Sequence, residues 1–398
     1  MTSSPLPVIR LLPKTKPQAI RRGYPWVYAN EVVTDRRTRA MSPGTIAVLE
    51  DSDRSPLALV GVNPNSKIIG RVLDAPEAAH PDQQWFETRL SKALALRERL
   101  FPTPFYRLIH AEADGLPGVI IDRFGDTAVV QPNAAWADAL LPDLTAALAK
   151  VTGVTTILKN AGGRGRSLEG LDDADAVLLG DAPTGAIPVE MNGATYMADL
   201  LGGQKTGLFF DQRPNHAFAA RLAKGARVLD VFSHVGGFGL AALAGGAVSA
   251  HCVDGSEPAL ALAAQGARHM SAEDKLITTK GDAFDVLTTL GDEQARYEVV
   301  VCDPPAFAPS NKAREAGLRA YERIARLSAP LVAEDGYLVL CSCSHAADMS
   351  SFTGACLRGI GRAGRRAQLI HTGQAGPDHP LLPQLAESGY LKALFFRL

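Results

Sequence analysis

The chain is poor in cysteine and has no long apolar run, and these two absences exclude several classes of protein. Its five cysteines among 398 residues are odd in number and thinly spread, which argues against a disulfide framework. The N-terminal stretch lacks the apolar core and cleavage site of a secretory signal, so we expect a cytoplasmic chain with reduced thiols. Residues 231–253 carry no Asp, Glu, Lys or Arg, but their five glycines fit a strand, turn and helix better than a membrane span.

A strong net charge is also missing, since the formal charge at pH 7 is −1. That balance excludes binding to nucleic acid by bulk charge alone. The distribution is uneven, because residues 1–40 hold eight Lys or Arg against two Asp or Glu, a balance of +6 that leaves −7 for the rest. Charge alone leaves open whether this basic end contacts phosphates or is only solvated.

Length and sequence pattern predict three domains in a globular protein. Residues 1–76 contain short apolar runs separated by Gly, Pro, Asn and Asp, which indicate a small β-barrel. Residues 77–186 open with a helical pattern, continue through a strand, an "FGD" turn and a returning strand, and predict an α+β domain whose further helix spans 136–151. Residues 187–398 alternate strands and helices, which predicts a Rossmann-like, doubly wound parallel sheet.

Polar side chains follow the predicted strands of the last domain, where such sheets bind ligands. Asp230 closes the first strand, and a turn through Gly236 and Gly237 would let the backbone approach a bulky ligand, unless it is an ordinary tight turn. Asp254 ends the second strand, twenty-four residues after Asp230, where it can accept hydrogen bonds from ribose hydroxyls. Asp282 ends the third strand, where a polar group can reach an adenine. Together these residues indicate a nucleoside pocket.

Two cofactors compete for this pocket, a nicotinamide dinucleotide and S-adenosylmethionine. The glycines read G-G-x-G and lack the G-x-G-x-x-G pattern of dinucleotide sites. The fourth strand ends in Asp303, Pro304 and Pro305, a rigid loop that suits holding a flat base beside a methyl donor and has no role in hydride transfer, although Asp-Pro-Pro can also be a simple turn. The pattern therefore favours S-adenosylmethionine.

The stretch "CSCSH" places Cys341 and Cys343 at the end of the apolar run "GYLVL". A metal site is disfavoured because no second Cys/His set stands at zinc-like spacing, and a redox pair is disfavoured because C-x-x-C is absent. Burial in the core is the main alternative, since free cysteine is often buried. The position of Cys343 at the pocket end of its strand, one strand along from Asp303, favours a nucleophile instead.

Nearly the whole chain resembles the S-adenosylmethionine-dependent large-subunit rRNA cytosine-C5 methyltransferases with an N-terminal PUA domain. The matching segments are "GYPWVYANEV", "EADGLPGVIIDRFGD", "GGQKTGLFFDQRPN", "VLDVFSHVGGFGLAALAGGA", "DPPAF", "CSCSH" and "DHPLLPQLAESGYLK", in this order.

By this resemblance Cys343 is the nucleophile and Asp303 lies beside the target base, and we expect RNA contacts from Arg21, Arg22 and Trp26. Large-subunit rRNA is the expected partner, and the chain could also form a homodimer. Neither a membrane nor a metal is expected. The residues expected around the cofactor are Lys205, Thr206, Phe209, Asp211, Arg213, Asp230, Phe232, Ser233, Gly236, Gly237, Asp254, Ser256, Asp282, Ala283, Asp303 and Pro304.

The chain departs from related RNA cytosine methyltransferases at Ala306, where they carry a second cysteine. The group that assists release of Cys343 is therefore unassigned, and Cys341 is more simply a core residue. One rival function is methylation of a guanine amino group, which needs no thiol. A second is a nonenzymatic RNA-binding or assembly factor that keeps the fold.

Overall fold

The computed structural model describes residues 6–202 and 207–398, so Lys205 and Thr206 lie outside the described residues. The chain divides into two compact units. The first unit contains the residues up to Ala182 together with Pro377–Ser388, and the second contains Pro183–Gly376 together with Gly389–Leu398. Within the described ranges, no helix has the length and apolar character needed to cross a membrane.

The short apolar runs near the N-terminus form a five-stranded sheet in the first unit, in the order β1-β3-β4-β5-β2. Val27, Leu49, Val60 and Ile69 lie in its core, which confirms the predicted β-rich region. The elements are β1 (Val8–Arg10), α1 (Gln18–Arg21), β2 (Trp26–Tyr28), α2 (Arg36–Arg39), β3 (Thr45–Glu50), β4 (Pro56–Val62) and β5 (Ile68–Asp74).

A second five-stranded sheet follows in the same unit, in the order β10-β9-β8-β7-β6, and the predicted antiparallel hairpin is its β7–β8 pair. The single helix expected over 136–151 is wrong, because the chain forms two helices that meet at Leu140. Pro142 lies in the first turn of the second helix, where its missing N–H and fixed φ are tolerated. The elements are α3 (Gln83–Leu100), β6 (Phe105–His110), β7 (Val119–Phe124), β8 (Thr127–Pro132), α4 (Ala135–Ala139), α5 (Leu141–Thr152), β9 (Thr156–Lys159), α6 (Arg164–Glu169) and β10 (Ala176–Leu179).

One hydrophobic core joins the two sheets of the first unit. Trp136 on α4 stacks on Phe86 with ring centroids 6.0 Å apart, and both pack with Leu59 of β4. Gly61 makes this possible, because a Cβ there would come within 2.6 Å of the Trp136 side chain. Residues on both sides of the predicted boundary at 76/77 are thus packed together, and the division into separate domains stays a prediction.

The second unit contains the predicted doubly wound sheet, with strand order β15-β14-β13-β16-β17-β19-β18. Its strands run parallel except β19, which is antiparallel to both neighbours. A β11–β12 hairpin precedes the sheet. The strands are β11 (Ile187–Met191), β12 (Ala194–Ala198), β13 (Arg227–Val231), β14 (Ser249–Asp254), β15 (Leu276–Lys280), β16 (Tyr297–Cys302), β17 (Val332–Ser342), β18 (Gln368–Gly373) and β19 (Lys392–Arg397).

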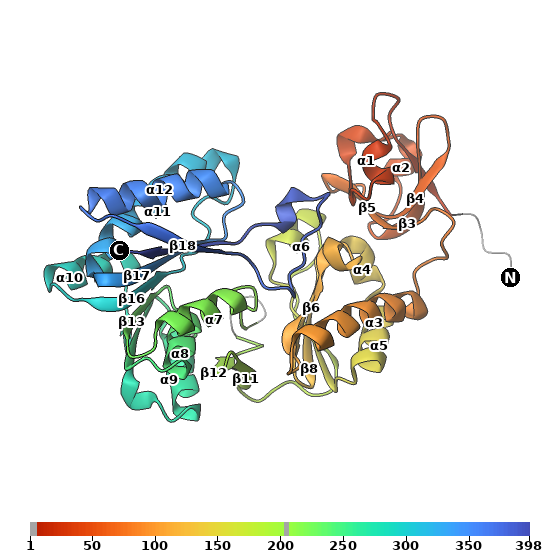
Figure 1. The fold of residues 1–398 in the computed structure, drawn as a ribbon. Coiled ribbons are helices and arrows are strands. Elements are labelled where there is room, and N and C mark those ends of the chain that lie inside the picture. The colour runs from red at the N-terminus through yellow and green to blue at the C-terminus, as the bar shows by residue number, and fades with distance from the viewer. Residues whose placement is uncertain (1–5, 203–206) are drawn as a thin grey trace. The chain divides into compact units, whose positions relative to one another are not determined.

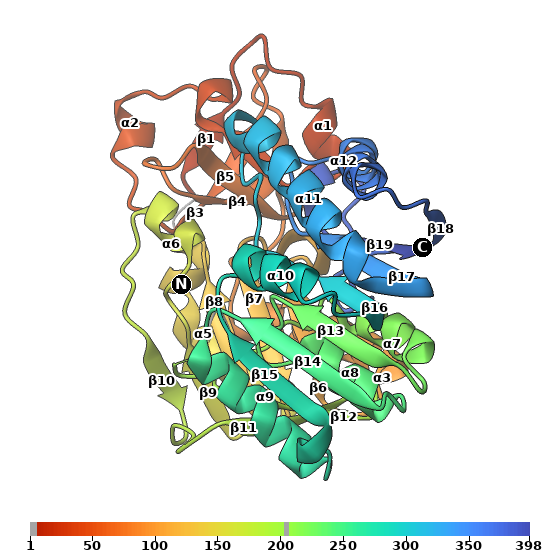
Figure 2. The ribbon, with the colours of Figure 1, turned by 90° about the vertical axis from the view of Figure 1, so that its left-hand side faces the viewer.

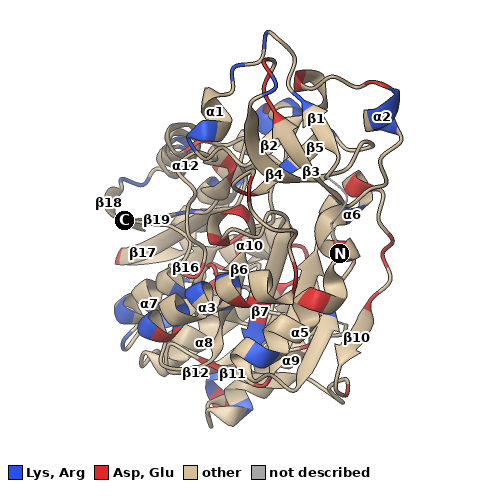
Figure 3. Ribbon diagram, turned by 90° about the vertical axis from the view of Figure 1, so that its right-hand side faces the viewer, with Lys and Arg blue, Asp and Glu red and all other residues tan. Residues whose placement is uncertain are grey.

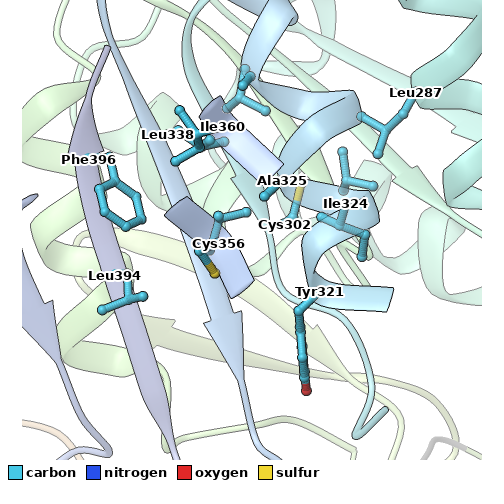
Figure 4. Close-up of a cluster of buried hydrophobic side chains, with 14 of the residues drawn as sticks. Leu287, Cys302, Tyr321, Ile324, Ala325, Leu338, Cys356, Ile360, Leu394 and Phe396 are labelled. Carbon is cyan, nitrogen blue, oxygen red and sulfur yellow. The ribbon is translucent and has the colours of Figure 1, made fainter. Parts of the chain in front are cut away.

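Helices cover both faces of this sheet, α7, α8 and α9 on one and α10, α11 and α12 on the other (Figures 1 and 2). Figure 4 shows the core under α11 and α12, where Cys302 and Cys356 lie among aliphatic side chains and the Tyr321 hydroxyl points away from the cluster. The helices are α7 (Arg213–Leu222), α8 (Gly237–Ala244), α9 (Glu257–His269), α10 (Ala283–Asp292), α11 (Arg314–Ser328) and α12 (Met349–Arg362).

The segment Pro377–Ser388 leaves the second unit after β18, packs with the first unit and returns to form β19. Asp378 anchors it. The Arg107 backbone N–H donates to its Oδ2 at 3.1 Å, and Arg97 Nη2 donates to its carbonyl oxygen at 3.1 Å. His379 Nδ1 lies 3.0 Å from Asp378 Oδ1.

Candidate active site

Several predicted site residues lie at the carboxyl ends of neighbouring strands of the second unit, namely Asp230 on β13, Asp254 on β14, Asp303 after β16 and Cys343 after β17. The strand order reverses at β13, which lies between β14 and β16. Such a topological switch point leaves a crevice where doubly wound sheets bind ligands. Asp303 follows β16 directly, and its N–H donates to Val231 O of β13 at 3.2 Å, which ties the Asp-Pro-Pro loop to this point.

The turn after β13 has an unusual backbone. Phe232, His234 and Gly236 have φ values of 63°, 51° and 82°. These lie in the left-handed region, which residues other than glycine rarely adopt. The Ser233 N–H donates to Val253 O at 3.0 Å and so joins this turn to β14. Strain of this kind persists where the fold enforces it, often at binding sites.

Asp230 is fully buried below this turn and has no cationic partner among the described ion pairs. Its Oδ2 accepts from Gly239 N at 2.8 Å, whereas Oδ1 is buried without a hydrogen-bond partner in the described part of the chain. Burial raises the pKa of Asp230 to about 7. His216 on α7 is likewise buried, with Nδ1 unpartnered among the described atoms, and burial lowers its pKa to about 3. Buried polar atoms without partners fit a site that a polar ligand completes.

Asp254 ends β14 as predicted, and the backbone holds its carboxylate in place. Oδ2 accepts from His234 N and Oδ1 accepts from Ser256 N, both at 2.8 Å. Each carboxylate oxygen can accept a second hydrogen bond, so the group is oriented and still able to accept from hydroxyls. Ser256 itself caps α9 by accepting from Ala259 N.

Asp282 differs from the expectation in its position, because β15 ends at Lys280 and Asp282 is the N-cap of α10. Its Oδ1 accepts from Phe284 N at 2.9 Å and Asp285 N at 3.3 Å, and the residue is exposed. The carboxylate therefore stabilises the helix, and the buried Ala283 follows it at the same edge of the sheet.

A chain of side-chain hydrogen bonds orients Asp303, which is half-buried. Gln212 Nε2 donates to Asp303 Oδ2 at 2.9 Å, and Gln212 Oε1 accepts from Asn215 Nδ2 at 2.6 Å. Gln212 is buried, and this pairing fixes its amide so that the N–H faces the carboxylate. Gln212 was not predicted as a site residue, although it belongs to the quoted "DQR".

The other predicted residues before α7 lie around the same turn. Phe209 makes an edge contact with His234, with ring centroids 5.1 Å apart. Asp211 is buried, and its Oδ2 accepts from the Tyr390 hydroxyl at 2.6 Å. The Arg213 guanidinium lies 5.5 Å from the Phe210 ring centroid. Pro304, next to Asp303, is buried.

The five cysteines fall into two classes. Cys343 is half-buried and comes directly after β17, whereas Cys252, Cys302, Cys341 and Cys356 are buried. Burial raises the pKa of Cys341 well above its usual range. Cys341 is thus packed as a core residue, and Cys343 is the thiol that a ligand can approach.

Buried hydroxyl groups lock the loop that carries Cys343. Ser342 Oγ donates to the Tyr321 hydroxyl at 2.9 Å, and that hydroxyl lies 2.8 Å from Ser344 Oγ. Ser344 Oγ also accepts from Ala308 N at 2.9 Å, which joins this loop to the segment after Asp-Pro-Pro. The serines on either side of Cys343 therefore set its position relative to the Asp303 loop.

Two further residues at this edge were missed. Lys392 on β19 pairs in register with Ser342, and its Nζ donates to Ser344 O at 2.9 Å. Tyr321 lies on α11, twenty-two residues before Cys343. Lys392 stands in the quoted "GYLK", but only the pairing of β19 with β17 brings it to the thiol loop.

The predicted RNA-binding residues lie in the first unit. Arg21 is exposed and lies 3.2 Å from Asp51 in an ion pair, and Arg22 is exposed. Trp26 is half-buried and its Nε1 donates to Glu112 Oε1 at 2.8 Å. Figure 3 shows Lys and Arg on α1 and along α2, among other elements.

Comparison with known proteins identifies the family. Residues 9–75 match a PUA-like domain, and residues 141–397 match the S-adenosylmethionine-dependent methyltransferases. The chain is 33% identical to a ribosomal RNA large subunit methyltransferase of Deinococcus radiodurans, over 100% of this chain and 99% of the relative. It is 33% identical to ribosomal RNA large subunit methyltransferase I of Tolumonas auensis, over 97% and 98%.

Solved structures share the fold. A methyltransferase crystallised with SAH aligns with a TM-score of 0.83 and 20% identity, over 99% of this chain and 100% of that one. A SAM-dependent methyltransferase from Streptococcus mutans aligns with a TM-score of 0.80, at the same identity and coverage. The expected relationship to PUA-containing large-subunit methyltransferases is confirmed, and the chain belongs to the S-adenosylmethionine-dependent methyltransferases, in the family of these ribosomal RNA large subunit enzymes.

Proposed function

We propose that the chain methylates C5 of a cytosine in large-subunit rRNA, and that Cys343 bonds covalently to the base during the reaction. Relatives that match the whole chain are named as ribosomal RNA large subunit methyltransferases. The observation that carries the cytosine assignment is the placement of Cys343, the one half-buried cysteine of five, one strand along from Asp303. Methylation of an amino group needs no thiol at this place.

The chemistry requires a nucleophile because C5 of cytosine is itself weakly nucleophilic. The Cys343 thiolate adds to C6, the electrons of the C5=C6 bond form a C4=C5 bond, and those of the C4=N3 bond move to N3, which takes up a proton, so that C5 becomes an enamine carbon. S-adenosylmethionine, when bound, supplies an electrophilic methyl group. Once C5 carries both the methyl group and its hydrogen, a base accepts the C5 proton, the C5–H electrons re-form the C5=C6 bond, N3 releases its proton, and the C6–S bond breaks to return the Cys343 thiolate.

Asp303 is proposed to hold the base at its N3 edge and to stabilise the adduct. The Gln212 amide donates to one of its carboxylate oxygens, so the carboxyl group is oriented before a base arrives. A group fixed in this way needs little reorganisation as charge develops on the ring.

The residues present fit S-adenosylmethionine, because the turn after β13 buries polar atoms that lack partners in the described structure. We assign the amino-acid end of the cofactor to Asp230 at the end of β13 and to Ser233, Gly236 and Gly237 in the turn that follows. The ribose is assigned to Asp254, whose carboxylate the backbone orients. Phe209, Asp211, Arg213, Phe232, Ser256, Asp282, Ala283 and Pro304 remain predicted neighbours of the cofactor, as do Lys205 and Thr206 beyond the described residues.

Covalent trapping tests this function. RNA with 5-fluorocytosine at the target should form a stable complex with the native chain, because fluorine cannot leave as the C5 proton does. Cys343→Ala should form no complex and transfer no methyl group, while still binding S-adenosylmethionine in a calorimetric titration. Cys341→Ala is the matched control, and we expect it to keep most of the activity and lose only about 1–2 kcal/mol of stability.

Methyl transfer by Cys343→Ala at the native rate would contradict the covalent mechanism and favour the guanine amino-group reaction. Failure of the native chain to bind S-adenosylmethionine would favour an assembly factor. Bisulfite sequencing of rRNA from cells with and without the protein would locate the modified cytosine.

The exposed basic residues of the first unit are proposed to contact the rRNA, with Arg21, Arg22 and Trp26 as the named candidates. Their support is the +6 balance of residues 1–40 and the PUA-like match. Arg22→Glu should weaken RNA binding most at low salt, and equal affinity at all salt concentrations would reject the assignment.

A further inference from the structure

Lys392 is a buried ammonium at the end of β19, beside the thiol loop. It is 6% exposed and pairs in register with Ser342, the residue before Cys343. Its Nζ donates to Ser344 O at 2.9 Å and to Tyr390 O at 2.8 Å. Lys392 therefore contacts both neighbours of Cys343 in the sequence. Its backbone pairs with Ser342, and its ammonium donates to the carbonyl oxygen of Ser344.

A buried ammonium is costly unless an anion or several acceptors compensate it. The ion pairs of the described residues include none for Lys392. Two of its three N–H donors go to neutral carbonyls, which leaves a third to donate. Burial lowers the pKa of Lys392, and negative charges on Cys343 and Asp348 oppose that shift. An ammonium that donates to the carbonyl oxygen of the residue after Cys343 favours the negatively charged form of that thiol.

Other charged or titratable groups lie near the same loop. Asp303 follows β16, Tyr321 comes from α11, and Asp348 caps α12. His345 and Tyr390 lie with their ring centroids 5.8 Å apart. Asp348 is paired with Arg314 at 2.9 Å, and the Nε of Arg314 donates to Ala346 O at 3.0 Å. The Asp303 carboxylate opposes a negative charge on the loop, whereas the Lys392 ammonium, which donates to the carbonyl next to Cys343, favours one.

We propose that Lys392 is a positioning residue that holds Cys343 as a reactive thiolate and fixes the loop that presents it. This inference rests on the proposed function, which makes Cys343 the nucleophile. It extends that function by naming the group that activates the nucleophile, on a strand that no cofactor residue occupies.

The test measures the thiol itself, without RNA or S-adenosylmethionine. The folded chain is treated with iodoacetamide over a range of pH, and alkylation of each cysteine is quantified by peptide mass spectrometry. Cys343 should react alone, because the other four cysteines are buried. Its rate should titrate with a midpoint below about 8.5, the ordinary value for a free thiol.

Lys392→Met should raise that midpoint by about one unit, which lowers the alkylation rate near pH 7 about tenfold. Lys392→Arg keeps the charge and should restore most of the rate. Lys224→Met, at an exposed lysine of the same unit, should change nothing. A variant that unfolds would reveal itself by alkylation of all five cysteines.

Three outcomes would overturn the inference. They are a native midpoint at or above the ordinary thiol value, an unchanged midpoint in Lys392→Met, and an equal shift in Lys392→Arg, which would indicate packing alone. If Lys392→Met does not fold, the alkylation midpoints of the native chain and of Lys392→Arg still test the inference. A low midpoint in a chain that forms no complex with 5-fluorocytosine RNA would instead count against the proposed function.

Discussion

The two units differ in whether their buried charged side chains form ion pairs. In the first unit they are paired: Arg97, fully buried, donates to both carboxylate oxygens of Asp114 at 2.9 and 2.6 Å. Arg107 likewise makes two hydrogen bonds to the buried Asp122, at 2.8 and 2.9 Å. In the second unit, Asp230 and Lys392 are buried with no ion-pair partner in the described part of the chain.

The difference separates architecture from function. A paired buried charge is compensated within the fold, and removing one partner costs stability. An unpaired buried charge lowers the stability of the fold, and such groups are found where a ligand or a reaction uses them. Asp230 and Lys392 both lie at the edge of the sheet where the proposed cofactor and base would bind.

Two natural probes report on the units separately. The three tryptophans, Trp26, Trp85 and Trp136, all belong to the first unit, and all five cysteines belong to the second. Tryptophan fluorescence therefore follows unfolding of the first unit, and thiol exposure follows unfolding of the second.

The largest effect on stability is expected from Arg97→Met, which leaves Asp114 buried without its cation. We expect the first unit to lose about 3–5 kcal/mol, the usual cost of breaking a buried ion pair. Urea denaturation followed by tryptophan fluorescence measures this loss, and thiol exposure should keep its midpoint. Arg99→Met is the matched control, because Arg99 is exposed on the same helix. Equal effects of the two substitutions would remove the contrast between the units.

A smaller effect, which depends on pH, is expected from Asp230→Asn. The folded chain binds the Asp230 proton more tightly than the unfolded chain, because the folded pKa of about 7 exceeds the ordinary value of 3.8. The loss of folding stability caused by ionising the buried Asp230 is therefore absent below about pH 4. It grows as the pH rises toward 7, to about 4 kcal/mol at most. Asp230→Asn should remove it.

Urea denaturation at pH 5 and pH 8, followed by the reaction of dithiodipyridine with the buried cysteines, measures this effect. The variant should gain more stability over the native chain at pH 8 than at pH 5, and should bind S-adenosylmethionine more weakly. Asp292→Asn, at an exposed carboxylate, serves as the control. A gain that is the same at both pH values would show that Asp230 is compensated.

The smallest effect is expected from Asp254→Ala, whose carboxylate is already satisfied by backbone N–H groups. Loss of an oriented acceptor should weaken binding of S-adenosylmethionine by about 1–3 kcal/mol. A calorimetric titration measures the change, with Asp282→Ala for comparison because that carboxylate caps α10 and is exposed. An unaltered dissociation constant in Asp254→Ala would reject the ribose assignment.

Local patterns predicted the elements that depend on neighbours in sequence. The strands that end at Asp254 and before Asp303 could be read from apolar runs followed by polar residues, because the alternation of strands and helices fixes where parallel strands end. The break between α4 and α5 was missed, since the effect of Pro142 depends on whether it starts a helix or interrupts one.

Contacts between distant residues account for what was missed at the site. Gln212 meets Asp303 across 91 positions, and Lys392 reaches Ser344 across 48. Such contacts depend on the order of strands in the sheet, and the antiparallel β19 between β17 and β18 leaves no periodic signal in sequence. Cys343 could be singled out as a candidate because cysteines are few in this chain, whereas lysine and glutamine are common on any surface.

The excursion of Pro377–Ser388 also has a consequence for synthesis on the ribosome. The first unit receives this segment, and the second receives β19 in the interior of its sheet, only after every other helix and strand has been made. Domains usually fold in turn as they emerge, but here the first unit is incomplete until Ser388 has been translated, and the second until β19 has been translated through Arg397. Partly made chains would lack both the Asp378 anchor and Lys392, so the proposed nucleophile would remain unactivated until translation of that segment is finished.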